Sequence, residues 1–132
     1  MSVTLRRDPS GRLRHRARIG RHTLIVDEPE AAGGEDAGPS PHDLYDAALG
    51  ACMALTLVWY AGREGLALTE VEVRIDRDAS DERNGCYRLR ATIRMAGRLG
   101  DADRQRLLAV AARCPVHRLM TQTRTEIETL MA

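Results

Sequence analysis

The chain has 132 residues, of which 43% are apolar and 30% charged, and its formal net charge at pH 7 is +1. This composition predicts one globular domain over residues 1–132, long enough to bury a hydrophobic core. Because basic and acidic residues nearly balance, no excess of positive charge indicates nucleic acid or an anionic membrane as a partner.

The N-terminal residues do not have the pattern of a secretion signal, which is a basic region, an apolar stretch and a small-residue cleavage site. The apolar run from Ala47 to Ala61 is shorter than the roughly 20 residues that cross a bilayer. We therefore expect a cytoplasmic protein that does not enter the membrane. Three cysteines in that compartment argue against a stabilising disulfide framework and leave buried or redox-active thiols.

The first segments predict a three-stranded antiparallel sheet. The stretch GRLRHRARI places an arginine at every second position, at Arg12, Arg14, Arg16 and Arg18, which is the period of a strand with one solvent face. The turn-forming residues DPSG and IGRH would join this strand to SVTLR before it and to TLIVDEP after it.

A long loop and a long helix follow. The segment EPEAAGGEDAGPSP is rich in Gly, Pro and acids and has no apolar period, so it predicts an exposed loop. Ser40, Pro41 and Asp43 are typical of a helix start, as N-cap, first helical residue and an acid that returns to the amide of the cap. The helix is expected to end near Gly62. From Ala47 onward it is apolar nearly all round, which predicts a central helix covered on every side by a second layer or a second subunit.

The remaining segments complete an α+β pattern. LTEVEVRIDR and CYRLRATIRM alternate as two strands of a hairpin, with the mostly acidic face of the first opposite the basic face of the second. DADRQRLLAVAARC predicts a helix with Leu107, Val110, Ala111 and Cys114 on one face, and Pro115 disfavours helical geometry at Cys114. TQTRTEIETL alternates and is expected to form a final strand.

Two thiols occupy marked positions, Cys52 inside the apolar helix and Cys114 before a proline, and two interpretations stay open. Free cysteines behave as small hydrophobes, so both could be core residues. Alternatively one attacks and the other resolves, in a cycle between dithiol and disulfide. About three turns into its helix, Cys52 would need a cation from the arginine-rich strand, unless Gly50 starts a new helix. Cys86, on the solvent side of a strand, is interpreted as an incidental thiol.

Metal and nucleotide chemistry find little support. The segment CPVH offers Cys114 and His117, which is half a zinc site without a second pair at suitable spacing. No Gly-rich phosphate loop follows a strand and opens a helix. We therefore predict no metal and no cofactor.

The segments DEPEAAGGEDAGPSPHDLYDAALGACMALTL and CPVHRLM resemble the OsmC/Ohr family of osmotically induced and organic hydroperoxide resistance proteins. The resemblance covers nearly the whole chain. It implies an α+β OsmC-like fold, with antiparallel sheets around a long buried central helix, in an intertwined homodimer. It also implies a thiol-dependent peroxidase for small organic hydroperoxides, reduced in turn by a dithiol or a lipoyl-bearing protein.

By the same resemblance, Cys52 matches the peroxidatic residue and Cys114 the resolving one. The family's activating arginine matches Arg12 best, with the other arginines at 14, 16, 18 and 21 as alternatives. His42 stands where many members have a glutamate, and the adjacent Asp43 could hold the arginine or serve only as a capping acid. The alternative function is a non-enzymatic dimer that binds a small hydrophobic ligand, with the cysteines lining its pocket or sensing redox state.

Overall fold

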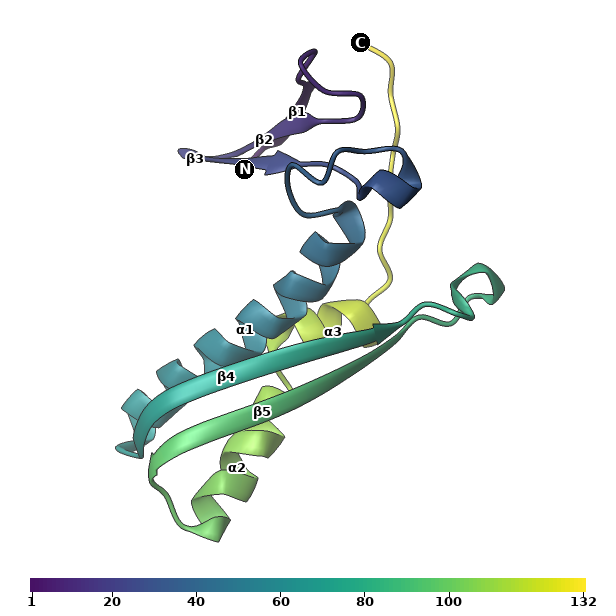
Figure 1. Cartoon of the computed structure of the whole chain (residues 1–132). Coiled ribbons are helices and arrows are strands. Elements are labelled where there is room, and N and C mark those ends of the chain that lie inside the picture. The colour runs from purple at the N-terminus through teal and green to yellow at the C-terminus, as the bar shows by residue number, and fades with distance from the viewer. The chain divides into compact units, whose positions relative to one another are not determined.

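The computed structural model describes all residues, 1–132, in two compact units, residues 1–46 and residues 47–132. The first unit carries a three-stranded sheet, and the second carries a long hairpin with helices (Figure 1). The α+β class predicted from the sequence is confirmed. The single domain stays a prediction.

The sheet of the first unit consists of β1 (Val3–Arg7), β2 (His15–Ile19) and β3 (His22–Val26), and both pairings are antiparallel, as predicted. The strand β2 is shorter than expected, because the Asp8 amide donates to the Arg14 carbonyl (2.8 Å) and closes residues 9–13 into a loop. Arg12 therefore lies in a loop and not on the strand.

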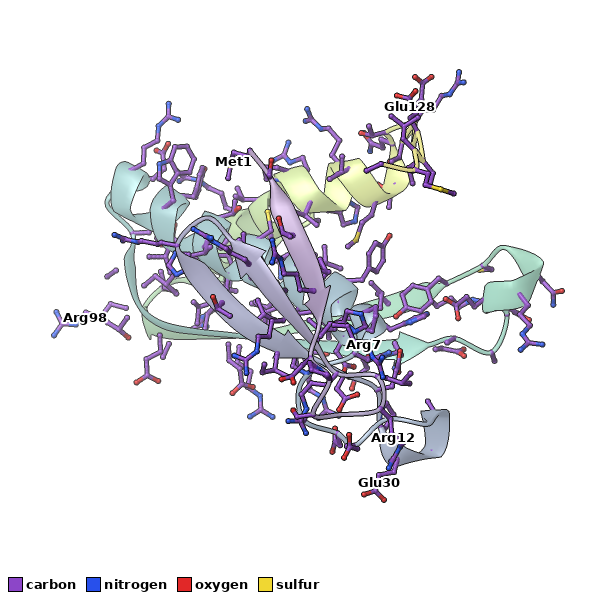
Figure 2. All side chains as sticks on the ribbon, turned by 90° about the horizontal axis from the view of Figure 1, so that it is seen from above. Met1, Arg7, Arg12, Glu30, Arg98 and Glu128 are labelled. Atoms are coloured by element: carbon purple, nitrogen blue, oxygen red, sulfur yellow. The ribbon has the colours of Figure 1, made fainter.

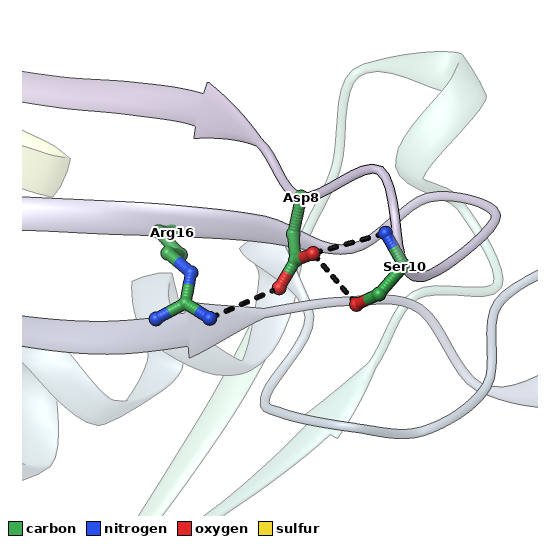
Figure 3. A network of polar contacts seen from close by, with 3 residues as sticks. All are labelled: Asp8, Ser10 and Arg16. Carbon is green, nitrogen blue, oxygen red and sulfur yellow. Dashed lines mark hydrogen bonds and ion pairs between the residues drawn. The ribbon is translucent and has the colours of Figure 1, made fainter.

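The carboxylate of Asp8 stabilises this loop (Figure 3). It accepts hydrogen bonds from the hydroxyl (2.6 Å) and the amide (3.0 Å) of Ser10, and Arg16 Nη2 lies 3.4 Å away. The hydrogen bonds from Ser10 lower the pKa of Asp8, so the carboxylate is ionised at neutral pH.

The segment between β3 and the first long helix contains a short turn, η1 (Glu30–Ala32), and two glycines in very close backbone contact. A Cβ at Gly34 would stand 1.9 Å from the Glu28 carbonyl oxygen, and one at Gly38 would stand 2.2 Å from that of Ile25. Only glycine fits at these two positions, because no side chain can approach a backbone oxygen so closely.

The long helix α1 (Pro41–Glu64) starts with the predicted capping box. The Ser40 hydroxyl accepts from the Asp43 amide (3.1 Å), and the Asp43 carboxylate accepts from the Ser40 amide (3.0 Å). Gly50 does not break the helix; it lets the β4 strand approach, because a Cβ there would stand 3.2 Å from Ile75 Cγ1.

Within one chain, α1 is buried along one face and exposed along another. The buried face recurs every four residues, at Leu49, Met53, Leu57 and Ala61. The opposite face exposes Leu55 (71%), Val58 (55%) and Trp59 (61%). Within a single chain, therefore, other elements do not cover α1 on every side, although the sequence predicts such cover by a second layer or a second subunit. By length and apolar composition alone α1 could cross a membrane, a test that the core helices of water-soluble proteins also pass.

The second unit is built on the antiparallel hairpin of β4 (Ala67–Asp78) and β5 (Arg88–Arg98), with the turn η2 (Glu82–Asn84) near its tip. The predicted charge pairing is confirmed, since Glu72 stands opposite Arg94 and Asp76 opposite Arg90. The alternate residues form an apolar face that packs against the helical core beside α1 (Figure 1). This face consists of Val71, Val73, Ile75, Leu89, Ala91, Ile93 and Met95.

Two helices complete the second unit, α2 (Asp101–Ala111) and α3 (Pro115–Thr121). The expected final strand over residues 121–130 is wrong: α3 runs through Thr121, and residues 123–132 have no regular structure and are exposed. A Thr-rich alternating segment needs a neighbouring strand, and the sheet of this unit contains only β4 and β5.

We predict opposite effects for two Gly→Ala substitutions. Gly34→Ala destabilises the first unit by about 1–3 kcal/mol, because its Cβ collides with backbone. Gly62→Ala, in α1 with nothing within 4 Å of its Cβ, stabilises the protein by about 0.5–1 kcal/mol through helix propensity. Urea unfolding of both variants measures the two effects, and a neutral Gly34→Ala would contradict the packing described here.

Candidate active site

The two thiols lie in one hydrophobic core. Cys52 is on α1, next to the buried residue Met53, and packs against the cluster that contains Leu107, Ala111 and Cys114. The cysteines are 62 positions apart in sequence and meet because the buried faces of α1 and α2 belong to the same cluster.

Cys114 has a local geometry set by the proline after it. Its backbone is extended (φ −62°, ψ 154°), as a residue before proline prefers, and it forms the N-cap of α3. Its sulfur accepts a hydrogen bond from the His117 amide at 3.4 Å. The adjacent Val116 amide donates to Cys52 Sγ at 3.5 Å, so two consecutive amides of one turn face the two sulfurs.

The side chains of Cys52 and Cys114 are close enough for each thiol to affect the other, and all three cysteines of the chain are free thiols. Burial is the largest cause and raises the pKa of Cys114; the His117 amide opposes it, and the neighbouring Cys52 raises the pKa further. Cys114 is therefore a protonated thiol at neutral pH. It is fully buried (0% exposed), whereas Cys52 is half-buried.

The surroundings of the sulfurs are apolar. The cluster around them contains Met53 and Leu57 from α1, with Val116 and Met120 of α3 packed against it. Apolar surroundings favour alkyl groups over polar molecules.

The predicted partners of the thiols, Arg12 and Asp43, belong to the first unit, whereas the thiols belong to the second. Arg12 lies beside the η1 turn that carries Glu30 (Figure 2), and its guanidinium donates to the carbonyls of Gly33 (Nε, 3.2 Å) and Gly34 (Nη2, 2.7 Å). The carboxylate of Asp43 accepts from the Ser40 amide and caps the start of α1. The part of either residue in chemistry stays a prediction.

The other candidate arginines have different neighbours. Arg16 lies near Asp8, and the Nε of Arg18 donates to the carbonyl of Gly20 at 3.3 Å. Cys86 is exposed at the hairpin tip, away from the core thiols.

Two features of the site were not found from the sequence. The first is the pair of amide donors at Val116 and His117, for which Pro115 was the available signal, since proline is frequent at the first position of a helix. The second is Asp27, a buried carboxylate that organises the loop around Arg12. In the sequence analysis, Asp27 was placed only at the end of the predicted strand segment TLIVDEP.

A scan against protein-family models matches residues 33–129 to the family described as OsmC-like protein. A search of the curated proteins finds no match.

Solved structures share the fold at low sequence identity. A crystal structure from Psychrobacter arcticus 273-4 is 20% identical, with a TM-score of 0.76 over 92% of this chain and 89% of the other. An organic hydroperoxide resistance protein OsmC from Legionella pneumophila is 18% identical, with a TM-score of 0.64 over 92% and 90%. The organic hydroperoxide resistance protein OhrB of Bacillus subtilis is 23% identical, with a TM-score of 0.59 over 92% and 90%.

We predict that the three thiols differ in their reaction with iodoacetamide. Cys86 is labelled fastest because it is exposed, and Cys114 is protected in the folded protein because burial removes access and keeps it protonated. Mass spectrometry of peptides before and after addition of urea measures the difference. Labelling of Cys114 at the rate of Cys86 in the folded protein would contradict this geometry.

Proposed function

The chain belongs to the OsmC-like protein family, and on that premise we propose that it is a thiol-dependent peroxidase that reduces organic hydroperoxides in peroxide defence. The observation that carries the proposal is the contact between Cys52 and Cys114 inside an apolar core. A pair of purely structural cysteines has no need to touch, whereas an attacking and a resolving thiol must do so. The hydroperoxide resistance proteins of similar fold support the same chemistry.

The exposure of the two thiols supports different roles for them in this proposal. Cys52 is half-buried and can be reached by a substrate, whereas Cys114 is fully buried and cannot meet the peroxide first. The Val116 amide that points at Cys52 Sγ would stabilise negative charge on that sulfur. Cys52 is therefore the attacking residue in this proposal and Cys114 the resolving one.

The reaction would proceed in two steps. Cys52 Sγ, as thiolate, attacks the distal oxygen of the hydroperoxide; the O–O bond breaks, and the alkoxide takes up a proton and leaves as an alcohol. Cys114 Sγ loses its proton and attacks the sulfenic sulfur of Cys52, and the hydroxyl group leaves as water. Two thiols and one hydroperoxide thus give a disulfide, an alcohol and water, and a dithiol or a lipoyl-bearing protein returns two electrons and two protons.

The surroundings of the thiols suggest the substrate class. Met53, Leu57, Val116 and Met120 belong to or pack against the cluster that holds both thiols, so an alkyl group on the peroxide would gain burial that hydrogen peroxide cannot. In this proposal Arg12 supplies the cation that favours the Cys52 thiolate, and Asp43 is the acid nearest to the position of the family's glutamate.

We predict turnover of tert-butyl and cumene hydroperoxides with a small dithiol as reductant. Cys52→Ser abolishes turnover because the attacking sulfur is lost, and Cys114→Ser abolishes it or leads to overoxidation because the sulfenic acid is not resolved. Consumption of hydroperoxide and the mass of the protein measure both effects.

Cys86→Ser is the matched control, and it should retain full turnover, since Cys86 is exposed at the hairpin tip. If the intact protein is no faster than the Cys52→Ser variant, the pair is not a peroxidatic centre. The better account is then the alternative, a dimer that binds a small hydrophobic ligand.

The exposed apolar face of α1 supports a homodimer as part of the proposal. Leu55, Val58 and Trp59 are more than half exposed, and a second copy of the chain would bury them. We predict that sedimentation gives twice the chain mass of 14.6 kDa. Leu55→Glu should shift the protein toward the monomer, whereas the control Thr92→Glu, at an exposed position of β5, should not. A wild-type monomer would contradict the prediction.

A further inference from the structure

A buried carboxylate and the guanidinium of Arg12 are joined through a single peptide group. The amide of Glu35 donates to Asp27 Oδ2 at 3.2 Å. The carbonyl of the same peptide group, that of Gly34, accepts from Arg12 Nη2 at 2.7 Å. The order of groups is therefore carboxylate, amide N–H, carbonyl and guanidinium, all within the first unit.

The carboxylate of Asp27 fixes the whole loop and not only this peptide. Its side chain is 2% exposed, its Oδ1 accepts from the Glu28 amide (2.8 Å) and its Oδ2 accepts also from the Ala37 amide (3.1 Å). The Asp27 amide donates to the Pro39 carbonyl (3.2 Å) and closes the loop at its far end.

The charge of Asp27 is retained at neutral pH. Burial, the largest single cause, acts to raise its pKa, but the amides of Glu28, Ala37 and Glu35, together with the charge of Arg14, outweigh burial and lower the pKa below its usual value. An ionised carboxylate on the N–H side of a peptide makes the carbonyl of that peptide a stronger acceptor.

Arg12 donates three hydrogen bonds to the loop that Asp27 organises. Besides its bond to Gly34, its Nε donates to the Gly33 carbonyl (3.2 Å), and its backbone amide donates to the carboxylate of Glu35 (2.9 Å). At Gly34 the backbone passes so close to the Glu28 carbonyl and to Asp27 Oδ1 that a Cβ there would stand 1.9 Å and 2.8 Å from these atoms. The direction of the guanidinium therefore depends on the loop, and the loop depends on Asp27.

We propose that Asp27 is a positioning residue for Arg12, and that its carboxylate holds the Gly34–Glu35 peptide in the orientation in which the Gly33 and Gly34 carbonyls direct the guanidinium. The inference rests on the proposed function, in which Arg12 supplies the cation for the Cys52 thiolate. Removal of the carboxylate frees the guanidinium without altering either thiol.

A double-mutant cycle on kcat/KM for cumene hydroperoxide tests the inference. Asp27→Asn, which keeps the shape but removes the charge, should lower kcat/KM by about tenfold, the size of a coupling within one hydrogen-bond network. In an Arg12→Ala background the same change should have no further effect, because the group it positions is gone. The matched control is Asp78→Asn in the second unit, whose carboxylate also accepts a backbone amide, that of Ser80 (3.0 Å), and which should leave kcat/KM unchanged.

A second readout does not depend on activity. In an NMR spectrum with ¹⁵N-labelled arginine, the Nε–H of Arg12 should exchange slowly in the wild type and fast in Asp27→Asn. If Asp27→Asn does not fold, Asp27→Glu replaces it in the cycle, since it keeps the charge but displaces it by one methylene.

Two results would overturn the inference, and they differ from failure of the proposed function. One is an equal loss of kcat/KM from Asp27→Asn in the presence and absence of the Arg12 side chain. The other is an Arg12 Nε–H signal unchanged by Asp27→Asn. A wild-type protein without turnover would refute the peroxidase, whereas the NMR signal would still decide whether Asp27 positions Arg12.

Discussion

The apolar contact that unites the buried face of α1 with that of α2 is the interaction on which the rest of the second unit depends. Leu57 and Leu107, both fully buried, belong to the one cluster that contains Ala111 and Cys114. Burial of each leucine contributes about 1.5–3 kcal/mol, far more than any contact of a sulfur. The thiols therefore do not hold the helices together; the helices bring the thiols together.

Pro115 sets the local geometry of the two thiols. It ends the helical geometry at Cys114 and starts α3, so that Cys114 becomes an N-cap with a free sulfur instead of one more residue in a continuous helix. The amides of Val116 and His117, which have no partner earlier in α3, are then available to the two sulfurs. One proline thus supplies both the bend and the hydrogen-bond donors.

Much of the fold could be predicted because its signals are local. The capping box at Ser40 and the alternation of β4 and β5 depend on neighbours in sequence, and both were found in the structure. The prediction of a final strand over residues 121–130 was wrong because a strand needs the edge of a sheet to pair with, which an alternating sequence alone does not supply. The predicted start of β2 was wrong because the Asp8 amide closes a loop, and Arg12 lies in that loop instead of in the strand. The burial of Asp27 depends on contacts with residues eight to twelve positions later, which no local pattern specifies.

If the proposed disulfide forms between Cys52 and Cys114, it would couple redox state to folding. A disulfide at this place would close a loop of about 60 residues and, by the loss of chain entropy in the unfolded state, would stabilise the second unit by about 4 kcal/mol. The oxidised protein would then be the more resistant to heat and proteases, and the dithiol form the more easily unfolded. In the proposed cycle a reductant would have to overcome that added stability, so the same core that assembles the thiols would set how strong a reductant is needed.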